Sequence, residues 1–283
     1  MPAHAKTNLS SWPDFGLNGG ENLLRGPPNS HIEKEWEKYM EGSMLMVHRG
    51  SRKLGRPELN VIATPEGTDT HRPVAHCSIV EALLEALAFR HISVVRDEYA
   101  VSPDGMKMFG VLDLETTFDD CRFSIGIRNS HDKSLRLAMT VGYRVMVCDN
   151  MAFWGDFTPV LAKHTRRFSL TDSLSIGVDR MQRNFEPLRG QVEAWKQNQL
   201  SDDSAKLVIY RAFIEGELEV PKHLLRRVHE LYFQLATPEL APRTMWSLTN
   251  AFTSAFKDLD PIPQFNATAK LARFLESPSG VAL

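Results

Sequence analysis

Cys148 and His164 are residue types that could form a nucleophilic site. Cysteine catalysis needs a thiolate and a nearby imidazole base, often oriented by an Asn or Asp. Cys148 is followed directly by Asp149 and Asn150, and His164 lies further along the chain. Two interpretations stay open. Either Cys148 is the nucleophile of an enzyme, or it is a buried core thiol while Asp149 and Asn150 cap the next element.

The run Asn129-Ser130-His131-Asp132 is a second candidate. A histidine beside an aspartate on a loop could transfer protons or bind a metal ion. Asn, Ser and Asp are also the types that hydrogen-bond to local backbone in a connection between strands. We therefore expect a turn here, with His131 and Asp132 kept as alternative members of a catalytic site.

A dense group of cations forms the third candidate and points to phosphate binding. Its members are Arg144, Lys163, His164, Arg166 and Arg167. Clustered Lys and Arg can bind phosphates even when the whole chain is close to neutral. A second basic set occurs later, at Lys222, Arg226 and Arg227.

Aromatic residues close to the first basic group could stack on bases. Phe153 and Trp154 precede it, Phe168 follows it, and Asn150 lies nearby. Exposed rings beside a basic groove are how sequence-tolerant proteins hold single-stranded nucleic acid. The alternative is that the rings belong to the core and the cations to a solvated face.

Composition and missing motifs exclude several classes of protein. The 283 residues are 42% hydrophobic and 24% charged, as is typical of a folded globular chain. The formal net charge of -2 gives no global basic excess, so nucleic-acid binding would need a local patch. The sequence lacks a P-loop, a dinucleotide-binding glycine fingerprint and an H-E-x-x-H motif, which argues against an ATPase, a simple dehydrogenase and a zincin. We expect no cofactor and assign no metal ligand.

Cysteine usage and hydropathy predict a cytoplasmic protein. Cys77, Cys121 and Cys148 are an odd, sparse set without a C-x-x-C pair, which does not resemble a disulfide framework. The polar N-terminal residues lack the apolar segment of a secretory signal, and no apolar run is long enough to span a membrane. We expect no membrane partner.

Strand patterns dominate the first half of the chain. The expected strands are 44–47, 92–101, 106–114, 122–128 and 135–148. Residues 102–105, with Pro and Gly in order, predict a tight turn between two of them. A helix is expected from an N-cap at Ser78, with Glu81 completing a capping box, to Phe89. Two further helices are expected at 31–40 and 157–162.

The second half follows helical spacing. The expected helices are 174–195, kinked at Pro187, then 207–214, 221–235, 244–259 and 267–275. Strands followed by helices, with hairpin signals between the strands, predict an α+β fold whose antiparallel sheet has a β-β-β-α-like core. We expect a flexible arm over 1–30, a sheet core over 31–170 and a helical region over 171–283, all in one domain.

Three stretches carry a resemblance to a known family. They are Ile127–Ser134, Tyr143–Asn150 and Lys163–Thr165, and the later run Trp246–Thr253 is also similar. They resemble the phage/plasmid-like family catalogued as domain of unknown function nine-three-two, with its "N-S-H-D-G" turn, "R-V-V-C-x-N" strand end, "R-H-T" element and "N-A-x-T" helix. Lys133 replaces the usual Gly, and Asp149 stands where Thr or Asn is common. The resemblance extends in order from Ser78 to Leu275.

The resemblance implies a protein of mobile genetic elements. The order of elements is also similar to the core of Rad-type single-strand annealing proteins, which form rings around a basic groove. The leading hypothesis is therefore an accessory protein that binds or anneals single-stranded DNA as a homo-oligomer. The alternatives are an enzyme with the Cys148 and His164 site, and a structural or interaction protein whose helical half forms a subunit interface.

Overall fold

The computed structural model describes residues 45, 47, 50–146, 148–154, 158–165, 168–234 and 240–276. The arm expected at 1–30 and the helix expected at 31–40 lie outside these residues. Residues 44 and 46 of the strand expected over 44–47 do too, and the described Leu45 and Val47 are not in a strand.

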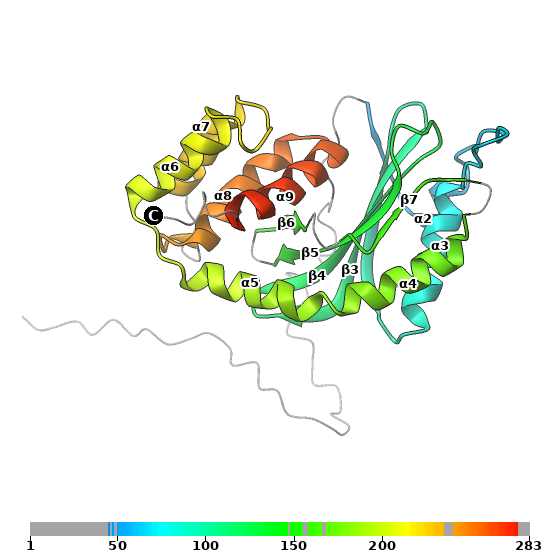
Figure 1. Ribbon diagram of the computed structural model, residues 1–283, viewed down its shortest axis with the longest axis horizontal. Coiled ribbons are helices and arrows are strands. Elements are labelled where there is room, and N and C mark those ends of the chain that lie inside the picture. The colour runs from blue at the N-terminus through cyan, green and yellow to red at the C-terminus, as the bar shows by residue number, and fades with distance from the viewer. Residues whose placement is uncertain are drawn as a thin grey trace, which may run out of the picture. The chain divides into compact units, whose positions relative to one another are not determined.

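An antiparallel sheet forms the centre of the described structure (Figure 1). Its strands are β1 (Arg52–Leu54), β2 (Val94–Val101), β3 (Lys107–Phe118), β4 (Cys121–Ser130), β5 (Leu137–Val145), β6 (Asn150–Phe153) and β7 (Val160–Ala162). The spatial order is β1-β2-β3-β4-β5-β6, and β7 also pairs with β5. β6 lies along Gly142–Val145 and β7 along Leu137–Met139, so they share one edge of β5.

Local sequence explains the central hairpins. In the turn between β2 and β3, the Ser102 hydroxyl and the Met106 N–H donate to Asp104, and Gly105 has a φ of 73°. β4 alternates as expected. Phe123, Ile125 and Ile127 join the larger apolar core cluster, while Ser124 and its even-numbered neighbours lie on the opposite face.

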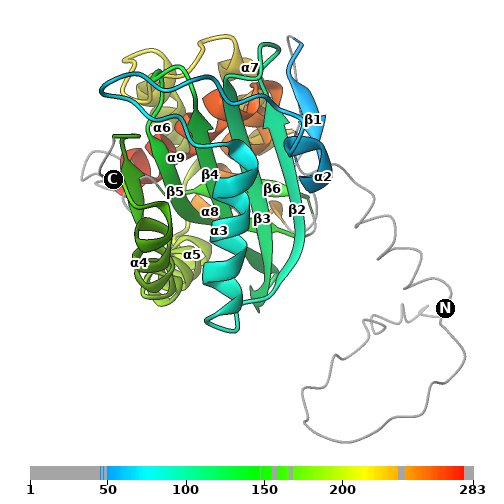
Figure 2. The ribbon, with the colours of Figure 1, turned by 90° about the vertical axis from the view of Figure 1, so that its right-hand side faces the viewer.

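Helices cover both faces of the sheet. α3 (His76–Ala88) and α4 (Leu170–Gln182) lie on one side, and α8 (Met245–Ala255) and α9 (Pro261–Glu276) lie on the other (Figure 2). The remaining helices are α2 (Arg56–Leu59), α5 (Phe185–Gln197), α6 (Asp202–Phe213), α7 (Leu224–Phe233) and the short 3-10 helix η2 (Phe256–Asp258). One apolar cluster contains side chains from the strands and from helices α3 to α9. The predicted α+β class, with its antiparallel sheet in the first half and helices in the second, is confirmed.

Three element predictions are wrong in detail. Of the helix expected at 157–162, residues 160–162 form strand β7, because their backbone pairs with β5. The long helix expected over 174–195 is two helices, and Pro187 lies in the first turn of α5, where its missing N–H removes no helical bond. α3 begins at His76, with Ala75 rather than Ser78 as N-cap, because the Ile79 N–H already donates to the Ala75 carbonyl.

Candidate anion-binding site

The turn between β4 and β5 is held by one aspartate. The Ser134 N–H and hydroxyl both donate to Asp132 Oδ1, at 3.0 and 2.5 Å. Burial is the largest single influence on the Asp132 carboxyl and acts to raise its pKa. The hydrogen bonds from Ser134 and the other favourable contacts together outweigh it, so the pKa of Asp132 lies below its ordinary value. Lys133 has a φ of 64°, a left-handed conformation that Gly adopts most readily. The predicted turn is therefore confirmed for Asp132, and Lys133 takes a glycine conformation at the tip.

Pairing of β7 with β5 brings a second segment to this turn. β7 lies against the first residues of β5, so the segment Lys163–Thr165 that follows β7 lies beside the start of β5. A third segment joins them, because the Arg72 N–H donates to the His164 carbonyl at 3.1 Å. Three stretches that are distant in sequence thus meet at one end of the sheet.

A pocket of about 380 Å³ lies where the three segments meet. Three cations line it: Lys133, Arg136 and Lys163. Three hydroxyl groups also line it: Thr70, Ser134 and Thr165. His71, His164 and Leu135 complete the described part of the wall, and none of these lining residues carries a carboxylate. The described residues form no ion pair with the three cations, so their charge is available to an anion.

Four histidines are gathered behind this pocket, in two stacked pairs. His71 lies nearly parallel to His164, with ring centroids 5.8 Å apart, and His76 stacks on His131 at 4.0 Å. His76 donates from Nε2 to the Gly105 carbonyl and accepts at Nδ1 from an Asn129 amide. That pattern requires a neutral ring, which agrees with the pKa of His76 being lowered to about 4, chiefly by burial.

His71 is held by two backbone carbonyl groups. Its Nδ1 and Nε2 lie 3.1 and 3.0 Å from the carbonyl oxygens of His164 and His131. These contacts fix the ring between the two segments that meet at the pocket.

Burial keeps His164 neutral. Its ring is 5% exposed, and burial, followed by the charges of His71 and His131, lowers its pKa to about 4. Neither ring nitrogen has a hydrogen-bond partner among the described residues. The pocket thus combines a positive rim with an unpaired donor in its wall, and its chemistry suits a bound anion.

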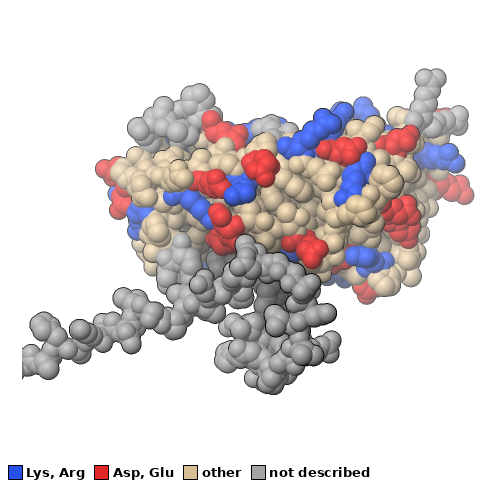
Figure 3. Space-filling view, turned by 90° about the horizontal axis from the view of Figure 1, so that it is seen from below, with Lys and Arg blue, Asp and Glu red and all other residues tan. Residues whose placement is uncertain are grey.

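The charge of the pocket contrasts with other parts of the surface. Figure 3 shows the molecule from below, on the side of α4 and α5. In the part that grey atoms do not cover, Lys and Arg are interspersed with Asp and Glu. Ion pairs of the described residues, such as Arg189 with Glu193 and Arg90 with Asp179, join opposite charges in this way. The pocket is a local basic site in a chain of formal net charge -2.

Comparison with known families matches a family model to residues 92–270, more than half of the 283-residue chain. The model is described as Domain of unknown function (DUF932). The chain belongs to this family. The family match contains the β4–β5 turn and Lys163–Thr165, whereas Thr70 and His71 precede it. Neither the curated proteins nor the solved structures gave a match.

Two of the family landmarks, Ile127–Ser134 and Lys163–Thr165, adjoin this pocket, and only part of the expected nucleic-acid site lies there. Lys163 is exposed in the pocket rim, and His164 lies in its wall. Arg166 and Arg167 lie outside the described residues. Sequence reasoning missed Thr70, His71 and Arg136. The signal for Arg136 was its place beside the predicted turn, next to Lys133.

The other predicted contacts with nucleic acid are corrected by burial. Arg144, Asn150, Phe153 and Trp154 are each at most 2% exposed. Phe153 fills the space above two glycines of the sheet, and Trp154 donates from Nε1 to Glu276 at the end of α9. From these positions they cannot contact phosphates or stack on bases.

Arg144 is held by a buried ion pair. Its Nε lies 2.8 Å from Asp113 Oδ2, and Asp113 also accepts from the Ser124 hydroxyl at 2.6 Å. Asp149, which has a φ of 53°, lies 3.5 Å from the same guanidinium. These contacts give Arg144 a structural role on the sheet face covered by α8 and α9.

The proposed Cys148 and His164 pair is contradicted by the topology. Cys148 follows the last residue of β5, Val145, while His164 lies beside its first, Leu137. At about 3.3 Å per residue, these ends are about 26 Å apart, whereas a nucleophile and its base must touch. Burial also raises the pKa of the Cys148 thiol, which is the opposite of an activated nucleophile.

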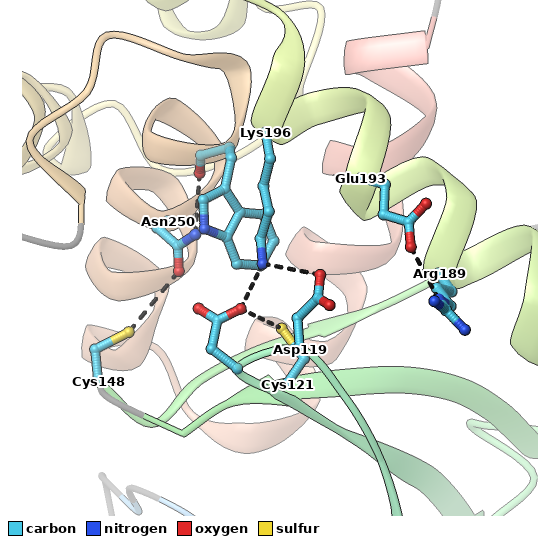
Figure 4. A network of polar contacts seen from close by, with 9 residues as sticks. Asp119, Cys121, Cys148, Arg189, Glu193, Lys196 and Asn250 are labelled. Atoms are coloured by element: carbon cyan, nitrogen blue, oxygen red, sulfur yellow. Dashed lines mark hydrogen bonds and ion pairs between the residues drawn. The ribbon is translucent and has the colours of Figure 1, made fainter. Parts of the chain in front are cut away.

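Cys148 contacts an amide instead of an imidazole, as Figure 4 shows. Its Sγ lies 3.8 Å from Asn250 Oδ1, and the Asn250 amide donates to the Trp246 carbonyl. Nearby, Lys196 pairs with Asp119 and Asp120. The interpretation of Cys148 as a structural thiol agrees with these contacts.

His131 and Asp132 do not form a catalytic pair in this structure. The His131 ring donates from Nε2 to the Val74 carbonyl and stacks on His76, while Asp132 holds the turn and lies 3.8 Å from Lys107. Among the described residues, no group of three or more His, Cys, Asp or Glu side chains could hold a metal ion. Within the same part of the chain, no helix is long and apolar enough to cross a membrane.

Proposed function

We propose that this protein is a nucleic-acid-binding accessory protein of mobile genetic elements, which binds and anneals single-stranded DNA as a cytoplasmic homo-oligomer. The observation that supports this is the pocket lined by Lys133, Arg136 and Lys163 without a carboxylate. Phosphate contacts of this kind supply most of the affinity of sequence-independent binding.

The sequence beside the pocket adds further cations. Arg166 and Arg167 follow Lys163 closely in the sequence. A single strand bends freely and can deliver successive phosphates into such a concave site. A DNA duplex, with a persistence length of about 50 nm, cannot follow it as closely.

Charge reversal in the pocket tests the proposal. The double variant Lys133→Glu with Lys163→Glu should weaken binding of a fluorescent single-stranded oligonucleotide by about 100-fold at low salt, because two attractive phosphate contacts become repulsive. The slope of log K against log salt should become shallower by about 1.4, since each single-strand phosphate contact contributes about 0.7. Fluorescence anisotropy across a salt series measures both quantities.

The matched control makes the same change of charge elsewhere. Lys222 and Arg227 are exposed at α7, which Figure 1 places at the opposite end of the molecule from β7. Lys222→Glu with Arg227→Glu should leave the affinity within about twofold, since long-range charge effects are screened by salt. The proposal is wrong if wild-type protein binds no single strand at low salt, or if the control loses as much affinity as the pocket variant.

The homo-oligomer in this proposal is supported by an exposed apolar face on α6. Leu207, Tyr210 and Ile214 are spaced along one side of this helix and are exposed. We expect light scattering to give a mass of more than one chain, and Tyr210→Lys to lower it, because a charge in an apolar interface is costly. A monomeric wild-type protein would contradict this part of the proposal.

A further inference from the structure

His164 has a feature that phosphate-backbone binding alone does not explain. Its ring is buried, yet neither Nδ1 nor Nε2 has a partner among the described residues. The neighbouring His71 differs, because both of its ring nitrogens bond to backbone carbonyls. A buried polar group without a partner is unfavourable, so in the wall of a pocket it indicates the position of a bound ligand.

The orientation of the His164 ring leaves its edge for the pocket. The ring is within 7° of parallel to His71 and within 20° of parallel to Phe168, with centroids 5.8 and 5.7 Å away. These neighbours lie against the faces of the imidazole. The edge that carries the nitrogens is therefore the part of this pocket-lining residue that is left for a ligand. Both nitrogens are closed to solvent in this structure, so a ligand must displace neighbouring atoms of the wall to reach them.

The rest of the wall selects a ligand with several acceptor oxygens and more than one negative charge. The three lysine and arginine side chains supply charge, and Thr70 and Thr165 supply hydroxyl donors, whereas the Ser134 hydroxyl already donates to Asp132. His164, being neutral, can donate one hydrogen bond. No lining side chain carries a negative charge that would repel such a ligand.

We propose that this pocket is a site for a phosphate monoester, bound by the His164 ring and the hydroxyl groups and neutralised by the three cations. Where the monoester is the terminal phosphate of a DNA strand, this inference rests on the proposed function. A monoester carries nearly two negative charges at neutral pH and three terminal oxygens. An internal phosphodiester has one charge and two free oxygens, and its chain must leave the pocket on both sides.

Oligonucleotides that differ only at their ends test the site. One sequence is compared with a 5′-phosphate, with a 3′-phosphate and with hydroxyl groups at both ends, using the full chain at fixed salt. At least one phosphorylated form should bind about tenfold more tightly than the hydroxyl-ended form, because it adds charge-assisted hydrogen bonds. Adenosine monophosphate should compete with it, and adenosine should not.

Two variants assign the preference to the pocket. His164→Phe keeps a flat ring between His71 and Phe168 but removes both nitrogens, and it should abolish the preference for a phosphorylated end. Thr165→Val changes an exposed residue and avoids any doubt about folding; it should reduce the preference about threefold, as expected for one lost hydrogen bond. The matched control is Thr171→Val, an exposed threonine on α4, which should change nothing.

The outcomes separate this inference from the proposed function. Equal binding of all three oligonucleotides, with no competition by adenosine monophosphate, would overturn the monoester site and leave DNA binding intact. Binding of adenosine monophosphate that His164→Phe abolishes, without binding of any oligonucleotide, would support the site and overturn DNA binding. A preference that survives in His164→Phe and in Thr165→Val would overturn the assignment to this pocket.

Discussion

Replacing Asp113 with alanine should lower the free energy of unfolding by about 3–5 kcal/mol, because it leaves the buried Arg144 charge without its closest partner. Both side chains are almost completely buried, and they lie 2.8 Å apart. The remaining carboxylate near Arg144, that of Asp149, is 3.5 Å away and half exposed, so it compensates only weakly. Thermal unfolding should show a melting temperature lower by roughly 10 °C.

Two further variants show whether the lost partner is the cause. Asp113→Leu with Arg144→Met removes both charges and keeps apolar volume, so it should be clearly more stable than Asp113→Ala. Glu193→Ala removes one partner of the exposed Arg189 pair and should leave the melting temperature unchanged. If Asp113→Ala is as stable as Glu193→Ala, the buried pair does not stabilise the fold.

Replacing Gly142 with alanine should destabilise the protein by about 3 kcal/mol, at the upper end of overpacking effects. A Cβ atom at Gly142 would lie 2.1 Å from the Ala152 carbonyl oxygen and 2.8 Å from Phe153 Cδ1. The first contact is with backbone, so no side-chain rotation can relieve it. β6 must move away from β5, although it also contacts α8 and α9. The midpoint of urea unfolding measures the effect.

Gly190 provides a control with the opposite sign. It is exposed within α5, and a Cβ there would meet nothing within 4 Å. Gly190→Ala should therefore stabilise the protein by about 0.5–1 kcal/mol, because alanine favours the helix. Equal effects of the two substitutions would contradict the close approach of β6 to Gly142.

These two predictions concern the same part of the sheet, at the opposite end of β5 from the pocket. Around Arg144 the charges are paired and buried, and Phe153 fills the space above Gly126 and Gly142. Around Lys163 the charges are exposed and have no paired carboxylate in the described part of the chain. Stability and ligand binding are therefore expected to depend on separate residues, which lets variants of one be tested without disturbing the other.

Local patterns predicted most of the strands and C-terminal helices. The alternation in β4 and the Asp104–Gly105 turn depend on residues that are neighbours in sequence, so their structure could be predicted from the chain alone. The amphipathic spacing of α7, with Leu224, Val228 and Tyr232 buried, is equally local. The turn at Asp132 was predictable for the same reason, because its bonds span two residues.

The candidate site could be predicted only in part. Lys163 and His164 stood out because cations are dense in that segment. Their meeting with Lys133, Arg136 and His71 depends on β7, which was predicted as a helix and becomes a strand by pairing with β5. A three-residue strand at a sheet edge has too little local signal to be recognised, because its hydrogen-bond partner is distant in sequence.

By itself, the sequence determined the α+β class, the central hairpins, the family and the presence of a dense basic segment at 163–167. Only the tertiary structure decided which cations are exposed. Arg144 and Lys163 are both basic residues on or beside strands of the same sheet edge. Arg144 is covered by the C-terminal helices and faces Asp113, whereas Lys163 follows β7 out to the rim of the pocket. The physical reason is that burial depends on which long-range element covers a residue, and periodicity within one segment carries no information about that partner.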